Sequence, residues 1–206
     1  MRLVLLSDTH GHHDALAVPG GDVLVHAGDF THGGSLEEVA AFGRFLAGLP
    51  HPRKVVVAGN HDFALQQDPE RARDALGACD YLEDGSAVIG GVRFHGSPWQ
   101  PWFLDWAFNL PRGPALAAHW DLIPDDTDVL VTHTPPLGRG DSLADGTAVG
   151  CADLAAAVAR VAPRLHVFGH IHEDAGRTRT GATTFVNAAC CDLSYRLARP
   201  PVVFDL

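Results

Sequence analysis

The chain has 206 residues, of which 46% are hydrophobic and 19% charged, and this favours a single globular α/β domain over residues 1–206. Its formal net charge of −10 argues against a nucleic-acid surface, because phosphate backbones bind clustered Lys and Arg. An acidic protein can still bind a phosphate ester if bound cations invert the local potential. We therefore expect no long nucleic acid as a partner.

The ends and rare residues of the chain give weaker indications. Met1 leads almost at once into an apolar strand, with no charged leader, cleavage site or membrane-spanning run, so we expect a cytoplasmic protein without a membrane partner. Lys54 is the only Lys, and Ala and Gly are abundant, which suggests a GC-rich, bacterial genome. None of the cysteines forms a Cys-x-x-Cys motif, so we predict free, mostly buried thiols at Cys79, Cys151, Cys190 and Cys191.

The first three predicted strands each end in polar residues. They cover residues 3–6, 22–26 and 54–57, and their apolar runs are typical of buried strands. Gly59 is expected to turn the backbone sharply at the end of the third strand. Asp8 and His10 lie two apart and would share one side of an extended segment. The polar residues that follow the three strands are Asp8, His10, Asp29, Asn60, His61 and Asp62.

The connecting segments contain two predicted helices and a hairpin. Ser35 is a good N-cap for a helix that Pro50 stops, and a second helix covers residues 69–76. Residues 86–95 read as a hairpin broken by two glycines. Residues 99–108 hold three of the four Trp without clear periodicity. They form either a satellite hydrophobic cluster or the wall of a substrate pocket.

The second half of the chain repeats the pattern of strands with polar ends. A strand at 128–131 is followed by His133, and a strand at 165–168 by His170 and His172. A helix is expected over residues 151–161, and short strands over 183–186 and 202–204. Because the carboxyl ends of strands in an open α/β sheet form the ligand-binding edge, the polar residues of all five ends should meet there.

These residues offer imidazole, carboxylate and amide ligands but no thiolate. Such a set suits Mn, Fe or Zn, and the absence of Cys argues against a structural zinc site. A lone Asp or His at a strand end is more often a cap, by about two to one, but five such ends on one edge reverse those odds. Seven ligands are too many for one ion and suit two ions that share a carboxylate, the recurring device of phosphoester chemistry. We expect Asp8, His10, Asp29, Asn60, His133, His170 and His172 to be the ligands.

The other histidines default to structural or surface roles. His26 and His166 lie inside strands and should be hydrogen-bonded core residues. His12, His13 and His32 lie in loops beside ligand positions, where a role toward substrate has low odds.

The five blocks, in this order, resemble those of the calcineurin-like metallophosphoesterase superfamily. Further segments, including 21–31, 96–99, 135–138 and 165–169, resemble the metallophosphoesterase-domain-containing brain proteins and their bacterial relatives. The resemblance implies a four-layer α/β/β/α sandwich. It also implies that the first metal is held by Asp8, His10, Asp29 and His172, and that the second is held by Asp29, Asn60, His133 and His170.

The resemblance also implies a mechanism. A hydroxide held between the two ions attacks phosphorus in line, His61 protonates the leaving oxygen, and Asp62 orients the His61 ring. Protein phosphatases of this superfamily have an Arg shortly after the Gly-Asp block, and the stretch that follows Asp29 here lacks it. His170, which some brain-type relatives have lost, is present.

The function implied is hydrolysis of small phosphodiesters, such as cyclic nucleotides, with Mn²⁺ the ion expected to support activity. The alternatives are a phosphomonoesterase of small phosphates and, at about one in ten, a non-catalytic metal-binding scaffold protein of the same fold. A small phosphoester is the expected partner. The sequence leaves the oligomeric state open.

Overall fold

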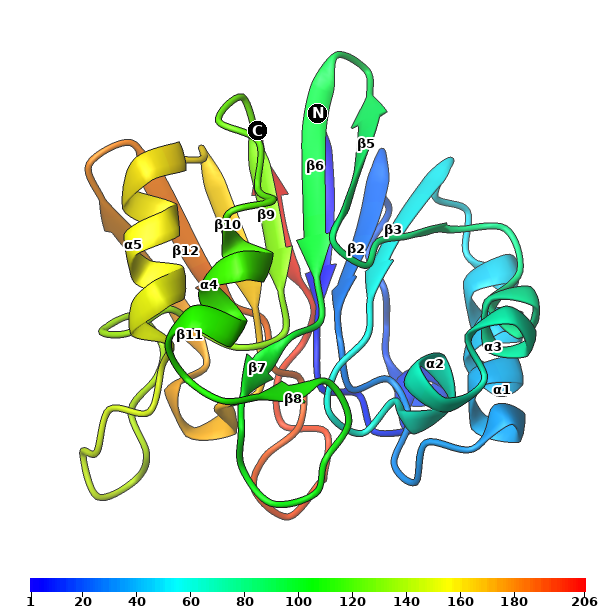
Figure 1. Cartoon of the computed structure of the whole chain (residues 1–206). Coiled ribbons are helices and arrows are strands. Elements are labelled where there is room, and N and C mark those ends of the chain that lie inside the picture. The colour runs from blue at the N-terminus through cyan, green and yellow to red at the C-terminus, as the bar shows by residue number, and fades with distance from the viewer.

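Two β-sheets lie face to face in the computed structural model, which describes all 206 residues (Figure 1). The first sheet has the strand order β13 (Val202–Asp205), β1 (Arg2–Leu6), β2 (Val23–Ala27), β3 (Arg53–Val57) and β4 (Asp80–Tyr81). The second has the order β11 (Gly176–Thr180), β12 (Thr183–Asn187), β10 (Leu165–Phe168), β9 (Val129–Thr132), β6 (Val92–Ser97) and β5 (Gly85–Ile89). A small ribbon pairs β7 (Gln100–Pro101) with β8 (Asn109–Leu110).

Helices cover the outer face of each sheet, which gives four layers and confirms the predicted α/β/β/α sandwich (Figure 1). Over the first sheet lie α1 (Leu36–Gly48), α2 (Phe63–Gln67) and α3 (Pro69–Leu76). Over the second lie α4 (Pro114–Trp120) and α5 (Ala152–Val161). Two short 3-10 turns, His13–Ala15 and His172–Asp174, complete the elements.

The layering explains why the strands read as unbroken apolar runs. In β1, Leu3 and Leu5 belong to the core between the two sheets, whereas Val4 and Leu6 belong to the core beneath the helices. Both faces of the strand are therefore buried, and every position must be apolar. The same alternation holds in β9, where Val129 faces the central core and Leu130 faces the helices.

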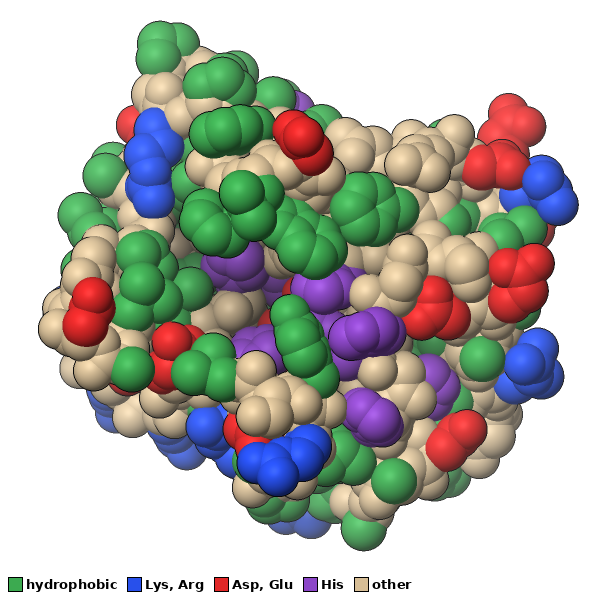
Figure 2. Space-filling model, turned by 90° about the horizontal axis from the view of Figure 1, so that it is seen from below, with side chains coloured by type: hydrophobic (Ala, Val, Ile, Leu, Met, Phe, Trp, Pro, Cys, Tyr) green, Lys and Arg blue, Asp and Glu red, His purple; other side chains and the backbone are tan.

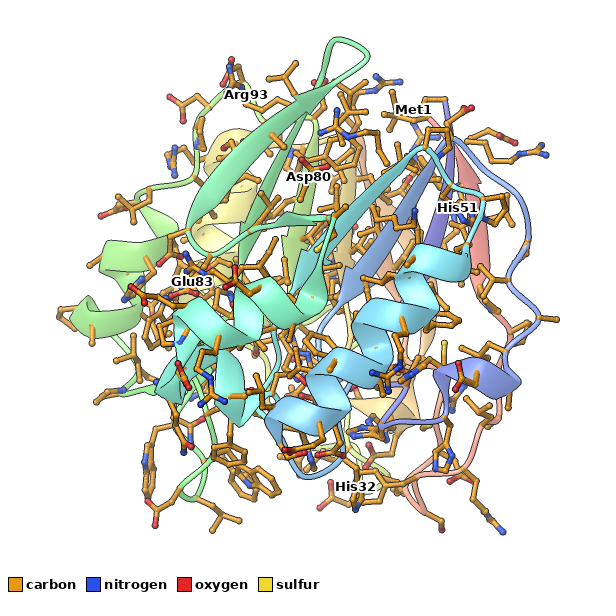
Figure 3. The ribbon with its side chains drawn as sticks, turned by 90° about the vertical axis from the view of Figure 1, so that its right-hand side faces the viewer. Met1, His32, His51, Asp80, Glu83 and Arg93 are labelled. Atoms are coloured by element: carbon orange, nitrogen blue, oxygen red, sulfur yellow. The ribbon has the colours of Figure 1, made fainter.

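Parallel pairing brings the polar strand ends to one edge. Strands β1, β2 and β3 run parallel, as do β6, β9, β10 and β12, so their carboxyl ends point the same way. A bridge between Ser7 and Ala189 joins the two sheets at this edge. Figure 3 shows His32 at this lower end of the molecule, with Met1, His51 and Arg93 at the opposite end.

The elements predicted from the sequence are present, and the structure adds others. The helix over 69–76, the hairpin β5–β6 and the strands at 183–187 and 202–205 are confirmed. The sequence analysis missed α2, α4, β4, β11 and the β7–β8 ribbon, all short or polar. The four cysteines are free, as predicted. None of the helices combines the length and the apolar character needed to cross a bilayer.

Candidate metal centre

The predicted ligands lie together where the two sheets meet. Asp8, His10 and His172 bring ligand atoms within 4.8 Å of one another, and so do Asp8, Asp29 and His133. Figure 2 shows the His side chains gathered in a hollow of the lower face, with hydrophobic side chains around part of it. The structure therefore brings into one site residues that the sequence places on five separate strand ends.

The first ligand group joins the end of β1 to the segment after β10. His172 Nε2 lies 3.2 Å from Asp8 Oδ1 and 3.3 Å from His10 Nε2. His172 Nδ1 donates to the carbonyl of Asp192 at 3.0 Å, so the lone pair of Nε2 is directed into the site. Three donor atoms thus converge on one point.

The second group lies on the other side of Asp29. Asn60 Oδ1 lies 2.9 Å from His133 Nε2 and 2.9 Å from His170 Nδ1. His133 Nδ1 donates to the carbonyl of Ala27 at 2.9 Å, so its Nε2 also offers a lone pair.

Asp29 lies between the two groups. Its Oδ2 is 3.4 Å from His133 Nε2 in one group and 3.9 Å from His10 Nε2 in the other. Its Oδ1 accepts a hydrogen bond from the backbone N–H of His61 at 2.8 Å, which fixes the carboxylate. Asp29 therefore occupies the position of a ligand shared by two ions.

The donor set fits cations. Around His133 Nε2, one lone pair faces the oxygens of Asp29 and Asn60, an arrangement of acceptors that only a proton or a metal ion can satisfy. Burial by itself lowers the pKa of His133, but the Asp29 carboxylate raises it to about 9. Burial also opposes protonation of His172, and Asp8 raises its pKa to about 9. The cage therefore attracts positive charge, and metal ions would displace these protons.

The backbone around the ligands adopts an unusual conformation. Four of the seven predicted ligands have positive φ, namely Asp8 (53°), His10 (43°), Asp29 (56°) and His170 (68°). Such conformations cost about 1–3 kcal/mol each for non-glycine residues and cluster at functional sites. The expectation that Asp8 and His10 share one side of an extended segment is therefore wrong, since left-handed turns aim them instead.

Two glycines allow the strand ends to approach one another. A Cβ on Gly169 would collide with the Asp8 carboxylate and the Ser7 hydroxyl, and one on Gly59 would collide with the Asp29 carboxylate. Gly59 begins the predicted turn, in which the Asp62 N–H donates to the Gly59 carbonyl at 3.2 Å, but it does so without positive φ. It is required because it lets the second and third strand ends touch.

His61 lies beside the ligands without belonging to either group. Its Nδ1 donates to the carbonyl of His32 at 2.7 Å, which leaves Nε2 as the free ring nitrogen. Its ring lies 4.7 Å from that of His10 and 4.4 Å from that of Trp106, and only 5% of the residue is exposed.

Asp62 does not orient the His61 ring, which corrects the prediction. Its Oδ2 accepts from the backbone N–H groups of Asp29 and Gly59 at 2.9 and 2.8 Å. Its Oδ1 accepts from the backbone N–H and the hydroxyl of Thr31 at 3.0 and 2.7 Å. Asp62 is fully buried and ties the second strand end to the third, while the His32 carbonyl holds the ring.

A pocket of about 170 Å³ opens over the ligands. Both alternatives for residues 99–108 hold in part. Phe103 and Trp106 line the pocket. Phe108 belongs to the core, and Trp99 Nε1 donates to Asp84 at 2.8 Å. The complete lining is His10, Asp29, Asn60, His61, Gln100, Phe103, Trp106, His170, His172, Leu193 and Tyr195.

Two lining residues escaped the sequence analysis. Tyr195, with φ 56°, places its ring 4.7 Å from that of His10, and Leu193 lies beside it. Both lie in a loop without periodicity or motif, so no local signal marks them. His26 and His166 are buried and bonded to Thr9 and Thr132, as predicted.

Comparisons with known proteins identify the family of the chain. The family model described as calcineurin-like phosphoesterase matches residues 1–174. The human metallophosphoesterase domain-containing protein 1 is 44% identical over 230 residues, which cover 100% of this chain and 71% of its own. A UPF0046 protein of Caenorhabditis elegans, C25E10.12, is 41% identical over 228 residues, which cover 100% of this chain and 81% of its own. Bacterial origin stays a prediction, since these relatives are animal proteins.

A solved structure shows the same fold. The TT1561 protein of Thermus thermophilus aligns with a TM-score of 0.63 and 17% identity over 90% of this chain and 88% of its own. Another crystal structure aligns with a TM-score of 0.70 and 18% identity over 90% and 89%. At these identities the likeness shows the fold alone, and any inference about chemistry must come from the clustered side chains of this chain.

Proposed function

The chain belongs to the calcineurin-like phosphoesterase family, and we propose that it is a two-metal phosphodiesterase of small substrates, with cyclic nucleotides as one such class. A metal-dependent phosphoesterase is supported by the family and by the clustered ligands. The further steps, to two ions and to diesters, rest on the arguments below.

The observation that carries the proposal is the placement of Asp29 Oδ2 between two ligand groups. Two ions held there would polarise the phosphoryl oxygens and supply a nucleophile from bound water at neutral pH. The chain supplies the cage: Asp8, His10 and His172 on one side, and Asn60, His133 and His170 on the other. Mn²⁺, Fe and Zn²⁺ all suit this mixture of nitrogen and oxygen ligands, and Mn²⁺ is the first to test.

The hydrogen bonding of His61 supports a role for this residue in supplying the proton of the leaving group. Its Nδ1 is engaged by the His32 carbonyl, so a proton on Nε2 can be delivered to an oxygen in the pocket. The backbone N–H of the same residue holds Asp29, which fixes the distance between proton donor and cage.

The charge around the pocket favours a diester over a monoester. No Lys or Arg lines the pocket, and the stretch after Asp29 lacks the Arg of protein phosphatases. A monoester dianion carries a second charge that such a side chain commonly neutralises. A diester carries one charge, which the bound ions can balance alone.

A paired assay tests the proposal. Protein loaded with Mn²⁺ should hydrolyse bis(p-nitrophenyl) phosphate with a higher kcat/KM than p-nitrophenyl phosphate. Asn60→Ala, which removes one ligand, should abolish most of the rate, and His12→Gln, an exposed loop change, should not. A preference for the monoester would support the phosphomonoesterase alternative. Two bound ions without hydrolysis of either ester would support the scaffold alternative.

A further inference from the structure

Large apolar side chains are exposed on the two loops that contribute Phe103 and Leu193 to the metal pocket. We call Trp102, Phe103, Leu104 and Leu193 the apolar rim; their exposed fractions are 61%, 63%, 57% and 62%. Eight large hydrophobic residues of the chain are exposed, and four of them form the apolar rim. Such a concentration marks a binding surface more often than chance exposure.

The rim is continuous with the site. Phe103 and Leu193 line the same pocket as the ligands His10 and His172. The two parts of the rim come from loops far apart in the sequence, after β7 and after β12. In Figure 1 both loops hang from the lower end of the molecule, and Figure 2 shows hydrophobic side chains beside the cluster of His.

Hydrogen bonds hold the backbone of the rim segment at residues 102–104. Asn109 Nδ2 donates to the carbonyls of Phe103 and Leu104 at 3.1 and 2.9 Å, and its Oδ1 accepts from Gln100 Nε2 at 2.8 Å. The backbone N–H of Trp102 donates to the Leu110 carbonyl at 2.8 Å. The fold therefore fixes these apolar groups in water, where they gain nothing until another apolar group covers them.

The size of the pocket shows what part of a substrate reaches the rim. A cavity of about 170 Å³ is smaller than the roughly 300 Å³ at which pockets begin to enclose whole small ligands. It suffices for the phosphoryl group, so the alcohol part of an ester must extend outward over Phe103 and Leu193.

The surroundings offer little to a polar alcohol. Apart from ligands and His61, the polar groups in the lining are Gln100 and Tyr195. Gln100 already uses both donors, on the Ala107 carbonyl and on Asn109. Its Oε1 is a buried acceptor without a partner, so the lining offers a polar substrate this acceptor and the Tyr195 hydroxyl only. Along the first loop the charged residue next to the rim is Asp105, which follows Leu104. Along the second it is Asp192, which precedes Leu193 and is paired with Arg196.

We propose that the physiological substrate is a phosphodiester with an apolar alkyl or aryl alcohol, which lies on the apolar rim while the phosphate enters the metal pocket. This inference rests on the proposed function and narrows its substrate class to diesters of apolar alcohols, which places cyclic nucleotides, with their polar ribose, outside it. The alcohol binds before and during the reaction, so its contribution appears in kcat/KM.

The test is a series of alkyl p-nitrophenyl phosphates, from methyl to octyl, each kept below its micelle concentration. A methylene that leaves water completely gains about fourfold, so half-burial on the rim predicts about twofold per methylene in kcat/KM. The double variant Phe103→Ser with Leu193→Ser should flatten this slope. Leu122→Ser removes an equally exposed leucine outside the pocket, at 55% exposure, and should keep it.

Calorimetry with octylphosphonate and methylphosphonate gives a readout independent of turnover. Wild type should bind the octyl compound at least tenfold more tightly, and the double variant should lose that difference. A flat slope in wild type, or a slope that survives in the double variant, overturns the inference. So does binding to phosphatidylcholine vesicles through the rim without any slope on monomeric esters, since the rim then docks on a membrane. Failure of the proposed function differs from all of these, because even the methyl ester would show no metal-dependent hydrolysis.

Discussion

The variant His61→Gln separates proton donation from metal binding. The substitution keeps the backbone N–H that donates to Asp29 Oδ1 at 2.8 Å, so the shared carboxylate stays in place. It removes the ring and its hydrogen bond to the His32 carbonyl. Loss of one such bond costs about 0.5–1.5 kcal/mol in the free energy of unfolding, so the variant should fold and retain both ions.

The kinetic effect should be larger than the effect on stability. A positioned general acid contributes about 10²–10⁴-fold, which equals roughly 2.7–5.4 kcal/mol of activation free energy. The full loss applies only where the leaving oxygen is strongly basic and needs its proton in the transition state. A nitrophenolate departs without help, so an ester with that leaving group should lose clearly less.

The assay compares kcat for a nitrophenyl diester and an alkyl or nucleoside diester, with Mn²⁺ saturating and metal content measured on the same samples. His12→Gln is the matched control, because His12 is exposed in the neighbouring loop. Equal losses on the two substrates would mean that His61 positions phosphate. Loss of an ion would make His61 a ligand. Metal content is therefore measured, because ring nitrogens of His10, His32 and His61 lie within 4.8 Å of one another.

Three further predictions concern neighbouring residues. Fully loaded protein should contain two metal ions per chain by elemental analysis. Asp29→Ala should remove more metal than Asn60→Ala, because Asp29 lies against both groups whereas Asn60 contacts only His133 and His170; equal losses would contradict a shared ligand. Asp62→Asn replaces one carboxylate oxygen by an NH₂ group, which faces two donors and so loses two hydrogen bonds. The free energy of unfolding in urea titrations should fall by about 3–6 kcal/mol. A change below about 1 kcal/mol would show that these bonds contribute little. Trp106→Ala should alter the relative kcat/KM of different diesters at constant metal content, as its ring walls the pocket beside His61; a loss of stability alone would make it a core residue.

The buried strands and the cluster of polar residues at their ends could be predicted because each leaves a local trace. A strand covered on both faces must be apolar at every position, and Val4 and Leu5 show the two faces in adjacent residues. A polar residue directly after such a strand has no packing reason to be there, which is why Asp29 and His133 could be identified from the sequence. Parallel pairing gathers such ends within each sheet, and the packing of the two sheets brings Asp29 of the first beside His133 of the second.

The supporting contacts could not be predicted, because they join residues that are far apart in sequence. The bonds from Asp62 to Thr31 and Asp29 depend on how the second and third strand ends pack, and nothing in the Gly-Asn-His-Asp block reveals them. Tyr195 reaches His10 from a loop near the C-terminus. The apolar rim is also invisible as such, since a run of Trp, Phe and Leu reads as core until its exposure is known.

The local costs of the site indicate where its stability comes from. Asp8, His10, Asp29 and His170 adopt positive φ, at about 1–3 kcal/mol each, and the cage brings buried carboxylates together with ring lone pairs. Local preferences would not choose this arrangement, so the rest of the fold must impose it. The two cores that enclose β1 and β2, the glycines at the contact points and the four hydrogen bonds to Asp62 do so. A cage whose acceptors face one another in this way is stabilised by positive charge at its centre, and two metal ions supply more of it than two protons on His133 and His172. The strain and the clustering of donors are therefore two consequences of one arrangement, which the proposed ions would stabilise.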